Sequence, residues 1–334
     1  MRDRPKIPDE RIVAGLEQAY GISARAVAFL PIGNDAAASA FRIHDGQRAF
    51  FLKLRKGSPN RASLTVPHHL RVSGVESVVA PLIAISGQLF AELDGYSLIL
   101  YPWIEGESKW SKTLSRRQWR AWGAIMRAIH RAGVSEALKA QLPEEQYGKR
   151  WLRRFERVAG AVERNRQPHA FADELAALWR QKAAKIEQAR ARYLSLGSRL
   201  EAEDHVHVIC HADIHPANIM VDDGGAIHIV DWDEVVLAPR ERDLMFFLID
   251  GHPNDAVAAF MDGYGECKVD KIGLAYYRYD WVLQEYCDYG ERVLLSNELS
   301  ERELQFSIDE FKRLFSPGDV VELAEKAYRD SGKP

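Results

Sequence analysis

The sequence segment that decides the fold contains two motifs, HADIHPAN at residues 211–218 and IVDWD at residues 229–233. Asp213 lies five positions before Asn218, and Asp231 follows Asn218 by thirteen. The residues between Asn218 and Asp231 predict two short strands joined by an Asp-Asp-Gly-Gly turn, which is a β-hairpin. The hairpin would fold Asp231 back beside Asn218, so one site would contain two carboxylates and an amide oxygen.

These oxygen atoms favour phosphate chemistry. Carboxylate and amide oxygens are hard ligands that suit Mg²⁺ carrying a nucleotide phosphate, and one aspartate remains to handle a proton. We assign that role to Asp213, because a carboxylate beside a substrate hydroxyl orients it and accepts its proton during phosphoryl transfer. The simpler alternative is an aspartate that caps a turn before Pro216. The spacing to Asn218 and Asp231 favours the catalytic role.

The histidines of the first motif allow a different chemistry. His211, Asp213 and His215 are three residues of the kinds that bind zinc. The other histidines of the chain form no second cluster with the spacing of a metal site. We therefore favour His211 as a structural residue whose ring hydrogen-bonds the loop backbone, whereas His215 is either a loop residue or a substrate contact.

Composition and charge limit the class of protein. At 334 residues the chain is long enough for two lobes, and 46% hydrophobic with 28% charged residues is ordinary for a globular protein. The net charge of −3 gives no electrostatic footprint for nucleic acid. The sequence shows no run of eighteen apolar residues, and its first residues lack the apolar stretch expected of a signal peptide. Its three cysteines are widely spaced. We expect a cytoplasmic monomer or homodimer that binds a small molecule and neither membranes nor nucleic acid.

Strand signals dominate the first hundred residues, and helical signals follow. A helix over 9–20 would end at Gly21, and a second would cover roughly 60–72. The predicted strands are 26–30, 50–54, 78–80 and 96–101. The later predicted helices lie between Ser115 and Gly133, at 145–165, 170–196, 240–249, 254–264, 270–296 and 300–314, and from Pro317 onward. The pattern predicts an α+β fold with a nucleotide-binding lobe at 1–102 and a catalytic, substrate-binding lobe at 103–334.

Further candidate contacts lie outside the two motifs. Lys53 belongs to an apolar strand in which Phe51, Lys53 and Arg55 share a face, so it can meet phosphates as a mobile charge. The alternative is a solvated lysine on an edge strand. The turn at 31–39 contains Gly33 and offers backbone N–H groups to phosphates, although it matches no glycine-rich phosphate motif. The carboxylates that suit a cationic, hydroxylated substrate are Asp233, Asp280, Glu285 and Asp288.

The two motifs resemble the signature of the aminoglycoside phosphotransferase and choline kinase superfamily, whose members are related to protein kinases. The resemblance runs from about residue 8 to the end of the sequence and is strongest in the second half. The segments that resemble the spectinomycin-phosphorylating branch are 229–234, 237–246, 263–266, 269–271, 276–278 and 314–322. The resemblance implies a bilobal, protein-kinase-like fold with a small antiparallel sheet in its first lobe. It also implies transfer of the ATP γ-phosphate to a hydroxyl of an aminocyclitol antibiotic, spectinomycin, which confers resistance.

The resemblance also implies roles for single residues by position. Asp213 matches the catalytic base, while Asn218 and Asp231 match the Mg²⁺ ligands. Lys53 matches the lysine that binds phosphates. The residues that would contact adenine are Tyr101 to Trp103 in the hinge, with Met220 and Val230 from the larger lobe. ATP and Mg²⁺ are therefore the expected cofactors.

The sequence departs from the family pattern after the phosphate lysine. Kinase-like folds usually pair this lysine with a glutamate on the following helix. No acidic residue lies between Lys53 and Glu76, and Arg61 stands near the expected position of the glutamate. We expect Lys53 to pair with another carboxylate, of which Asp231 is the nearest candidate. Otherwise nucleotide binding is weaker or the lobes are arranged differently.

Two other functions stay open. The first is a kinase for another hydroxyl metabolite, such as choline, a sugar or an amino alcohol, and the acidic helices after residue 270 do not choose between these acceptors. The second is a nucleotide-binding protein without turnover, for which the missing glutamate is the argument. The intact set of Asp213, Asn218 and Asp231 opposes that second alternative.

Overall fold

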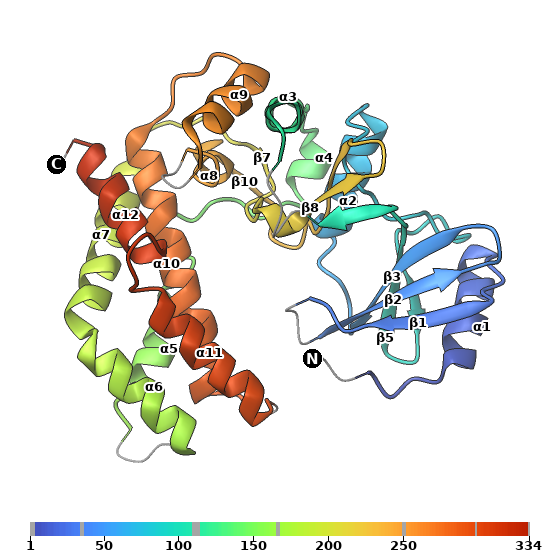
Figure 1. The fold of residues 1–334 in the computed structure, drawn as a ribbon, viewed down its shortest axis with the longest axis horizontal. Coiled ribbons are helices and arrows are strands. Elements are labelled where there is room, and N and C mark those ends of the chain that lie inside the picture. Colours follow the sequence, from blue (N-terminus) through green and yellow to red (C-terminus); the bar gives the residue numbers. More distant parts are fainter. Residues whose placement is uncertain are drawn as a thin grey trace. The chain divides into compact units, whose positions relative to one another are not determined.

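The computed structural model describes residues 4–33, 37–108, 114–164, 168–248, 252–297 and 299–332. This part of the chain combines a five-stranded sheet with a mainly helical remainder (Figure 1). It divides into two compact units. Unit 1 consists of residues 1–143, 211–236 and 258–265, and unit 2 consists of residues 144–210, 237–257 and 266–334.

The sheet of unit 1 is antiparallel throughout. Its strands, in spatial order, are β1 (Ala26–Leu30), β2 (Ala38–His44), β3 (Ala49–Lys56), β5 (Tyr96–Pro102) and β4 (Ala91–Leu93). Alternation along β3 directs Leu52 and Leu54 into the hydrophobic core and Lys53 to the opposite face. The sequence prediction of this strand is therefore confirmed, and its lysine stands on the face away from the core.

Helix α1 (Asp9–Tyr20) covers the apolar face of this sheet (Figure 1). Ile12 and Leu16 of α1 belong to the same buried cluster as the leucines of β3 and β5. The helix ends where predicted, because Gly21 adopts the left-handed conformation with φ of 66° and its N–H returns to the last turn. Residues 4–30 thus form a local scaffold behind the strand that carries Lys53.

Three further helices of unit 1 are α2 (Ala62–Val72), α3 (Arg116–Arg131) and α4 (Glu136–Lys139). Helix α3 begins with a capping box in which Ser115 and Gln118 bond each other's backbone N–H groups. It buries one apolar face, which contains Trp119, Trp122, Met126 and Ile129. Part of α9 (Asn254–Tyr264) packs so closely on α3 that a Cβ added to Gly123 would lie 1.9 Å from the carbonyl oxygen of Phe260.

The predicted hairpin is present in unit 1 and forms part of a three-stranded sheet. Its strands, in spatial order, are β6 (Gly106–Ser108), β8 (Ile219–Asp222) and β9 (Ile227–Ile229). A short 3₁₀ helix at Pro216–Asn218 leads into β8. Strand β6 was not predicted, since three exposed residues carry no hydrophobic alternation. A Cβ on Gly106 would lie 2.3 Å from the carbonyl oxygen of Val221, so glycine permits this pairing.

Unit 2 is built around one long helix, α10 (Lys271–Leu294) (Figure 1). The helices that pack against α10 are α5 (Leu152–Val162), α6 (Ala170–Gln181), α7 (Ala183–Glu201), α8 (Glu241–Leu244), α11 (Glu301–Arg313) and α12 (Val320–Asp330). The strands β7 (Val208–Cys210) and β10 (Val236–Ala238) form a small two-stranded sheet. These strands were not predicted, because each contains only three residues.

Three helix boundaries differ from the predictions. The expected helix at 170–196 is two helices that share Lys182 as a cap. The last helix does not begin at Pro317, because Asp319 accepts the N–H of Val320 and caps the helix there. The expected helix at 145–165 begins only after Trp151.

Two shorter predictions also fail. Residues 78–80 form no strand, although Val78 makes a single parallel bridge to Ile229. The helix expected at 240–249 is limited to the single turn of α8, and turn residues follow it to Leu248, where the described segment ends.

The two lobes predicted at 1–102 and 103–334 stay a prediction. The compact units are a different division of the chain, since each unit contains several separate segments. Among the described residues, no helix is both long and apolar enough to span a membrane.

Candidate active site

His211 fixes the loop that precedes the 3₁₀ helix, and its ring is fully buried. The ring Nε2 lies 2.9 Å from the carbonyl oxygen of Val230, and Nδ1 accepts the backbone N–H of Asp213 at 3.3 Å. These partners define the neutral tautomer with its hydrogen on Nε2. The ring therefore ties the loop to the end of the hairpin, and the predicted structural role of His211 is confirmed.

Asp213, the predicted base, is held by two side chains from the following residues. The Nδ2 of Asn218 donates to the Asp213 carbonyl oxygen at 2.7 Å and to its carboxylate Oδ2 at 3.0 Å. The Nε2 of His215 lies 3.4 Å from the same Oδ2. Burial raises the pKa of Asp213, but the interactions with His215, His211 and Asn218 together outweigh it and lower the pKa below its ordinary value. Asp213 is therefore an ionised carboxylate at neutral pH.

Asp231 follows the second strand of the hairpin. The N–H of Val230 donates to the Asn218 carbonyl oxygen at 3.0 Å, so the hairpin brings Asp231 to the end of the loop that carries Asn218. Asp231 adopts a left-handed conformation with φ of 63°. Desolvation raises the pKa of Asp231, Lys53 lowers it, and the charge of Asp233 raises it further. Because 51% of the Asp231 side chain is exposed, water screens these effects.

Lys53 pairs with carboxylates from the end of the hairpin. Its Nζ lies 2.6 Å from the Oδ2 of Asp233 and 3.6 Å from the Oδ1 of Asp231, and only 16% of the lysine side chain is exposed. The sequence named Asp231 as the nearest candidate, and the structure adds Asp233 at the shorter distance. Lys53 thus pairs with two aspartates from the end of the hairpin, although no acidic residue follows it before Glu76.

The residues predicted to surround adenine lie at the end of β5, directly after it and on the hairpin. Tyr101 of β5 pairs with Phe51 of β3. Burial, and then the charges of Asp233 and Asp231, raise the pKa of the Tyr101 phenol. The phenol therefore lies near the carboxylates that bind Lys53.

The other predicted adenine contacts are partly covered. The N–H of Trp103 donates to the Ala49 carbonyl oxygen at 3.4 Å, and the guanidinium of Arg42 lies 4.5 Å from the centroid of the Trp103 ring. Met220 and Val230 are half-buried on the hairpin. By strand alternation they share the face opposite the buried Ile219 and Ile229.

Gly33 belongs to the turn at 31–39 that was predicted to cover phosphates, and the last two residues of that turn, Ala38 and Ser39, already belong to β2. Gly33 has a φ of 86°, and among the described residues no heavy atom lies within 4 Å of a Cβ built on it. Residues 34–36 of that turn lie outside the described residues.

The histidine contacts argue against a zinc site. The His211 ring bonds the backbone through both nitrogens. The Nδ1 of His215 accepts the N–H of Ala217, and its Nε2 faces Asp213. A zinc ligand needs a nitrogen lone pair directed at the metal, so binding zinc would break the contacts that shape this loop.

Asp280 was predicted to contact the substrate, and its surroundings contradict that role. Both Asp280 and Arg242 have side chains only 1% exposed, and their charged atoms lie 2.6 Å apart. The other carboxylate oxygen of Asp280 accepts the indole N–H of Trp151 at 2.8 Å. The carboxylate is therefore committed to the interior of unit 2.

Glu285 and Asp288, the other acids predicted to bind substrate, lie further along α10. Asp288 forms an ion pair with Arg154, which Glu291 shares. Glu285 accepts the indole N–H of Trp281 at 2.9 Å. Burial is the main cause that raises the pKa of Glu285 to about 7. Both carboxylates are partly accessible, so they stay candidates for contact with a cation.

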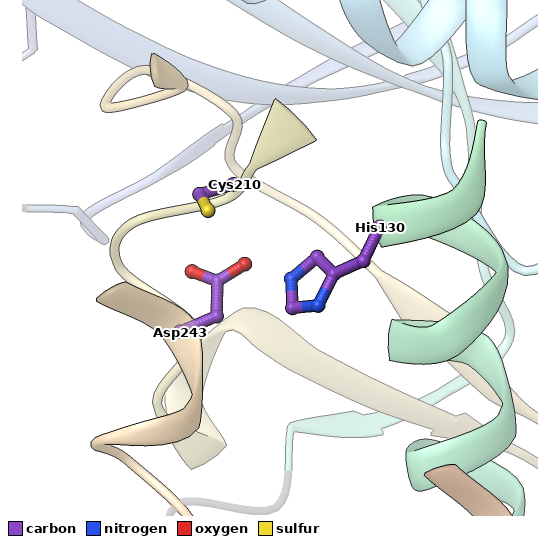
Figure 2. Close-up of side chains that lie close together, drawn as sticks. All are labelled: His130, Cys210 and Asp243. Atoms are coloured by element: carbon purple, nitrogen blue, oxygen red, sulfur yellow. The ribbon is translucent and has the colours of Figure 1, made fainter. Parts of the chain in front are cut away.

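Cys210, which directly precedes the first motif, is buried in unit 2. Its thiol lies beside the carboxylate of Asp243, a buried residue of α8 (Figure 2). Burial, and then the charge of Asp243, raises the pKa of Cys210 well above its usual range. The neutral thiol donates weakly to the carbonyl oxygens of Ala238 and Pro239 at 3.5 Å. Cys210 is thus a packing residue.

Two contacts at the site were missed from the sequence. The pair of Lys53 and Asp233 joins residues 180 positions apart, so no local pattern could indicate it. The contact of His215 with Asp213 had a signal in the short spacing of these residues, but the direction of the imidazole depends on the 3₁₀ helix.

Comparisons with known proteins agree with this geometry. A family model described as the phosphotransferase enzyme family matches residues 28–278. A solved structure of spectinomycin phosphotransferase in complex with ADP and spectinomycin is 29% identical with a TM-score of 0.86, over 97% of this chain and 99% of that one. An AMP-bound complex of spectinomycin phosphotransferase is 28% identical with a TM-score of 0.81, over 95% of this chain and 98% of that one.

More distant structures share the fold alone. A choline kinase from Streptococcus pneumoniae is 15% identical with a TM-score of 0.55, over 96% of this chain and 97% of that one. No curated protein matches the chain. The predicted α+β, protein-kinase-like fold is confirmed by these likenesses. Since the family model covers three quarters of the sequence, the chain belongs to the phosphotransferase enzyme family.

Proposed function

We propose that this protein transfers the γ-phosphate of ATP to a hydroxyl group of spectinomycin in a reaction that requires Mg²⁺. The observation that carries the proposal is the convergence, within unit 1, of the ionised Asp213, the amide of Asn218 and the cluster of Lys53 with two aspartates. The likeness to spectinomycin phosphotransferase over nearly the full length of both chains supports this acceptor. Resistance of cells to spectinomycin is part of the proposal.

The donor set fits Mg²⁺. The Asn218 side chain uses its nitrogen to hold Asp213, which leaves the Oδ1 oxygen as the atom for a cation. The Asp231 carboxylate is half-exposed, and the neighbouring carboxylate of Asp233 adds to the negative charge. Oxygen ligands with excess negative charge are those that Mg²⁺ prefers. Asn218 and Asp231 would hold the ion, which when bound neutralises charge on the nucleotide phosphates.

Lys53 supplies the second positive charge for the phosphates. Its ammonium group is held at the end of the hairpin by Asp233 and Asp231. The sequence had assigned Asp233 to contact with the acceptor. We infer instead that Asp233 orients Lys53. A lysine held in place binds phosphate oxygens without first losing side-chain entropy. The missing glutamate of α2 is therefore compatible with nucleotide binding.

Asp213 would act directly on the acceptor. An ionised carboxylate accepts a hydrogen bond from the hydroxyl group, orients its oxygen toward the γ-phosphorus and takes its proton as transfer proceeds. The lowered pKa of Asp213 keeps this group ionised at neutral pH. The backbone of Tyr101 to Trp103, with Met220 and Val230, would hold adenine, and the turn at Gly33 would cover the phosphates. Glu285 and Asp288 are the proposed contacts for amino groups of the cationic acceptor.

The test is a panel of acceptors offered to the purified protein with ATP and Mg²⁺. Release of ADP is measured with spectinomycin, choline, an amino alcohol and a sugar, and the product is identified by phosphorus NMR. We expect ADP release that depends on spectinomycin and stops when a chelator removes Mg²⁺. Turnover of choline, the amino alcohol or the sugar without turnover of spectinomycin would overturn the acceptor. Binding of ATP with no turnover of any acceptor would overturn the enzymatic function.

A further inference from the structure

The contacts of Asp213 distinguish its two carboxylate oxygens. The Nδ2 of Asn218 donates to Oδ2 at 3.0 Å, and the Nε2 of His215 lies 3.4 Å from the same oxygen. We propose that His215 is a positioning residue that, together with Asn218, anchors Oδ2 so that Oδ1 receives the proton of the acceptor hydroxyl. This inference rests on the proposed phosphotransfer to a hydroxyl group.

The 3₁₀ helix at Pro216–Asn218 explains why His215 can act only as a donor to Asp213. His215 is the N-cap of this helix, and its Nδ1 accepts the N–H of Ala217 at 3.2 Å. Because Nδ1 is an acceptor, the hydrogen of the neutral ring lies on Nε2, the nitrogen that faces Oδ2. The same helical turn also carries Asn218, whose N–H donates to the His215 carbonyl oxygen at 2.9 Å. This single helical turn therefore positions both groups that face Asp213 Oδ2, the His215 ring and the Asn218 amide.

Anchoring one oxygen has a chemical consequence for the other. A carboxylate oxygen that already accepts hydrogen bonds is the less basic of the two, so an incoming proton goes to Oδ1. In the transfer step the acceptor oxygen forms its bond to the γ-phosphorus as the bond from that phosphorus to the bridging oxygen of ADP breaks. ADP keeps the electron pair of the broken bond. The hydroxyl proton moves to Asp213 Oδ1 and is later released to solvent.

Two substitutions separate the positioning role of His215 from its capping role. His215→Asn keeps an acceptor for the Ala217 N–H but has no group at the position of Nε2. His215→Gln places an amide N–H near the position of Nε2 and loses the cap. We expect His215→Asn to lower kcat roughly 10- to 100-fold with nearly unchanged KM values and melting temperature, since a hydrogen bond to a charged group is lost. His215→Gln should keep most of the wild-type kcat despite a lower melting temperature.

A matched control comes from a second histidine and aspartate pair in the hairpin. His228 Nε2 lies 2.8 Å from the Asp222 carboxylate, and this pair does not include Asp213. His228→Asn should therefore leave kcat at the wild-type value. A wild-type kcat in His215→Asn, with Asp213→Asn inactive, would refute the positioning role and leave the proposed function intact. Loss of kcat in both His215 variants in proportion to their loss of stability would also refute it.

A measurement without turnover tests the same contact. Nitrogen-15 NMR of the histidine rings in the full chain reports which nitrogen carries the hydrogen. We expect the His215 ring to be the Nε2–H tautomer, with its Nε2–H signal shifted when Asp213 is replaced by alanine. An Nδ1–H tautomer, or an Nε2–H signal indifferent to Asp213→Ala, would overturn the inference whatever acceptor the enzyme uses.

Discussion

Replacing Asp280 by alanine tests whether this carboxylate is structural, as its surroundings indicate, or contacts substrate, as the sequence predicted. Its ion pair with Arg242 spans 2.6 Å, and both side chains are 1% exposed. Removing one partner of such a pair leaves a buried charge and costs about 3–5 kcal/mol. The indole N–H of Trp151 loses its acceptor as well. We expect the free energy of unfolding to fall by about 4 kcal/mol, which lowers the melting temperature by roughly 6 °C.

A neighbouring carboxyl group makes this loss depend on pH. Burial, and then the charge of Asp280, raises the pKa of Glu145, whereas Arg242 lowers it. Without Asp280 the pKa of Glu145 falls, so its ionised carboxylate partly compensates Arg242 above that pKa. The destabilisation by Asp280→Ala should therefore be larger in mild acid than at neutral pH.

Urea unfolding followed by circular dichroism measures the effect, and two variants serve as controls. Asp288→Ala should cost less than about 1 kcal/mol, because its partner Arg154 is partly exposed and keeps Glu291. The double variant Arg242→Met with Asp280→Leu should regain at least about 2 kcal/mol, since no buried charge remains. A loss below about 1 kcal/mol in Asp280→Ala would refute the reasoning. A raised KM for the acceptor at unchanged stability would restore the substrate role.

Three further changes test other parts of the structure. Lys53→Met should raise the KM for ATP roughly 10- to 100-fold through loss of a charged contact with phosphate, and steady-state kinetics would contradict this if the KM stayed at the wild-type value. Burial raises the pKa of Glu285 from 4.5 to about 7, so the folded state holds this proton more tightly than the unfolded chain does. That contribution to stability is full below pH 4.5 and is lost as the pH rises through 7. In urea titrations at several pH values, the wild-type protein should lose on the order of 3 kcal/mol of unfolding free energy between pH 4.5 and 7, whereas Glu285→Gln should show no such loss. An unchanged pH dependence in the variant would contradict this prediction. Gly123→Ala should cost about 2–3 kcal/mol because its Cβ would lie 1.9 Å from the Phe260 carbonyl oxygen. Gly160→Ala should be neutral or stabilising, since no atom of the described residues lies within 4 Å of a Cβ built there. Equal effects of the two substitutions in thermal unfolding would contradict the close packing of α9 on α3.

Local pattern predicted the elements whose ends and faces are set by neighbouring residues. The helix at Asp9–Tyr20 was found with its end at Gly21, because a left-handed glycine terminates a helix by local geometry. The hairpin after Asn218 was found because its turn residues and strand alternation lie within a dozen positions. The hairpin in turn places Asp231 near Asn218, so the centre of the candidate site was predictable from one short segment.

Contacts between distant segments were not predictable in the same way. The pairing of β6 with β8 depends on a glycine that lets two backbones approach, and nothing near Gly106 indicates a strand. Asp280 looked like a substrate contact because aromatic and acidic residues surround it in sequence. Its partner Arg242 lies 38 positions away, and burial of both groups decides its role. The partner of Lys53 was also hidden by distance in the sequence, because Asp233 lies 180 positions away and not on α2.

The central claim is that Asp213 accepts the proton of a spectinomycin hydroxyl as the phosphoryl group transfers. The most direct test is the rate of spectinomycin phosphorylation by wild type and Asp213→Asn at saturating Mg-ATP, with ATP affinity measured on the same samples by calorimetry. Asparagine preserves the shape of the side chain and removes the base, so we predict a fall in rate of about 10²- to 10⁴-fold at nearly unchanged ATP affinity. A variant that phosphorylates spectinomycin at the wild-type rate would contradict the account.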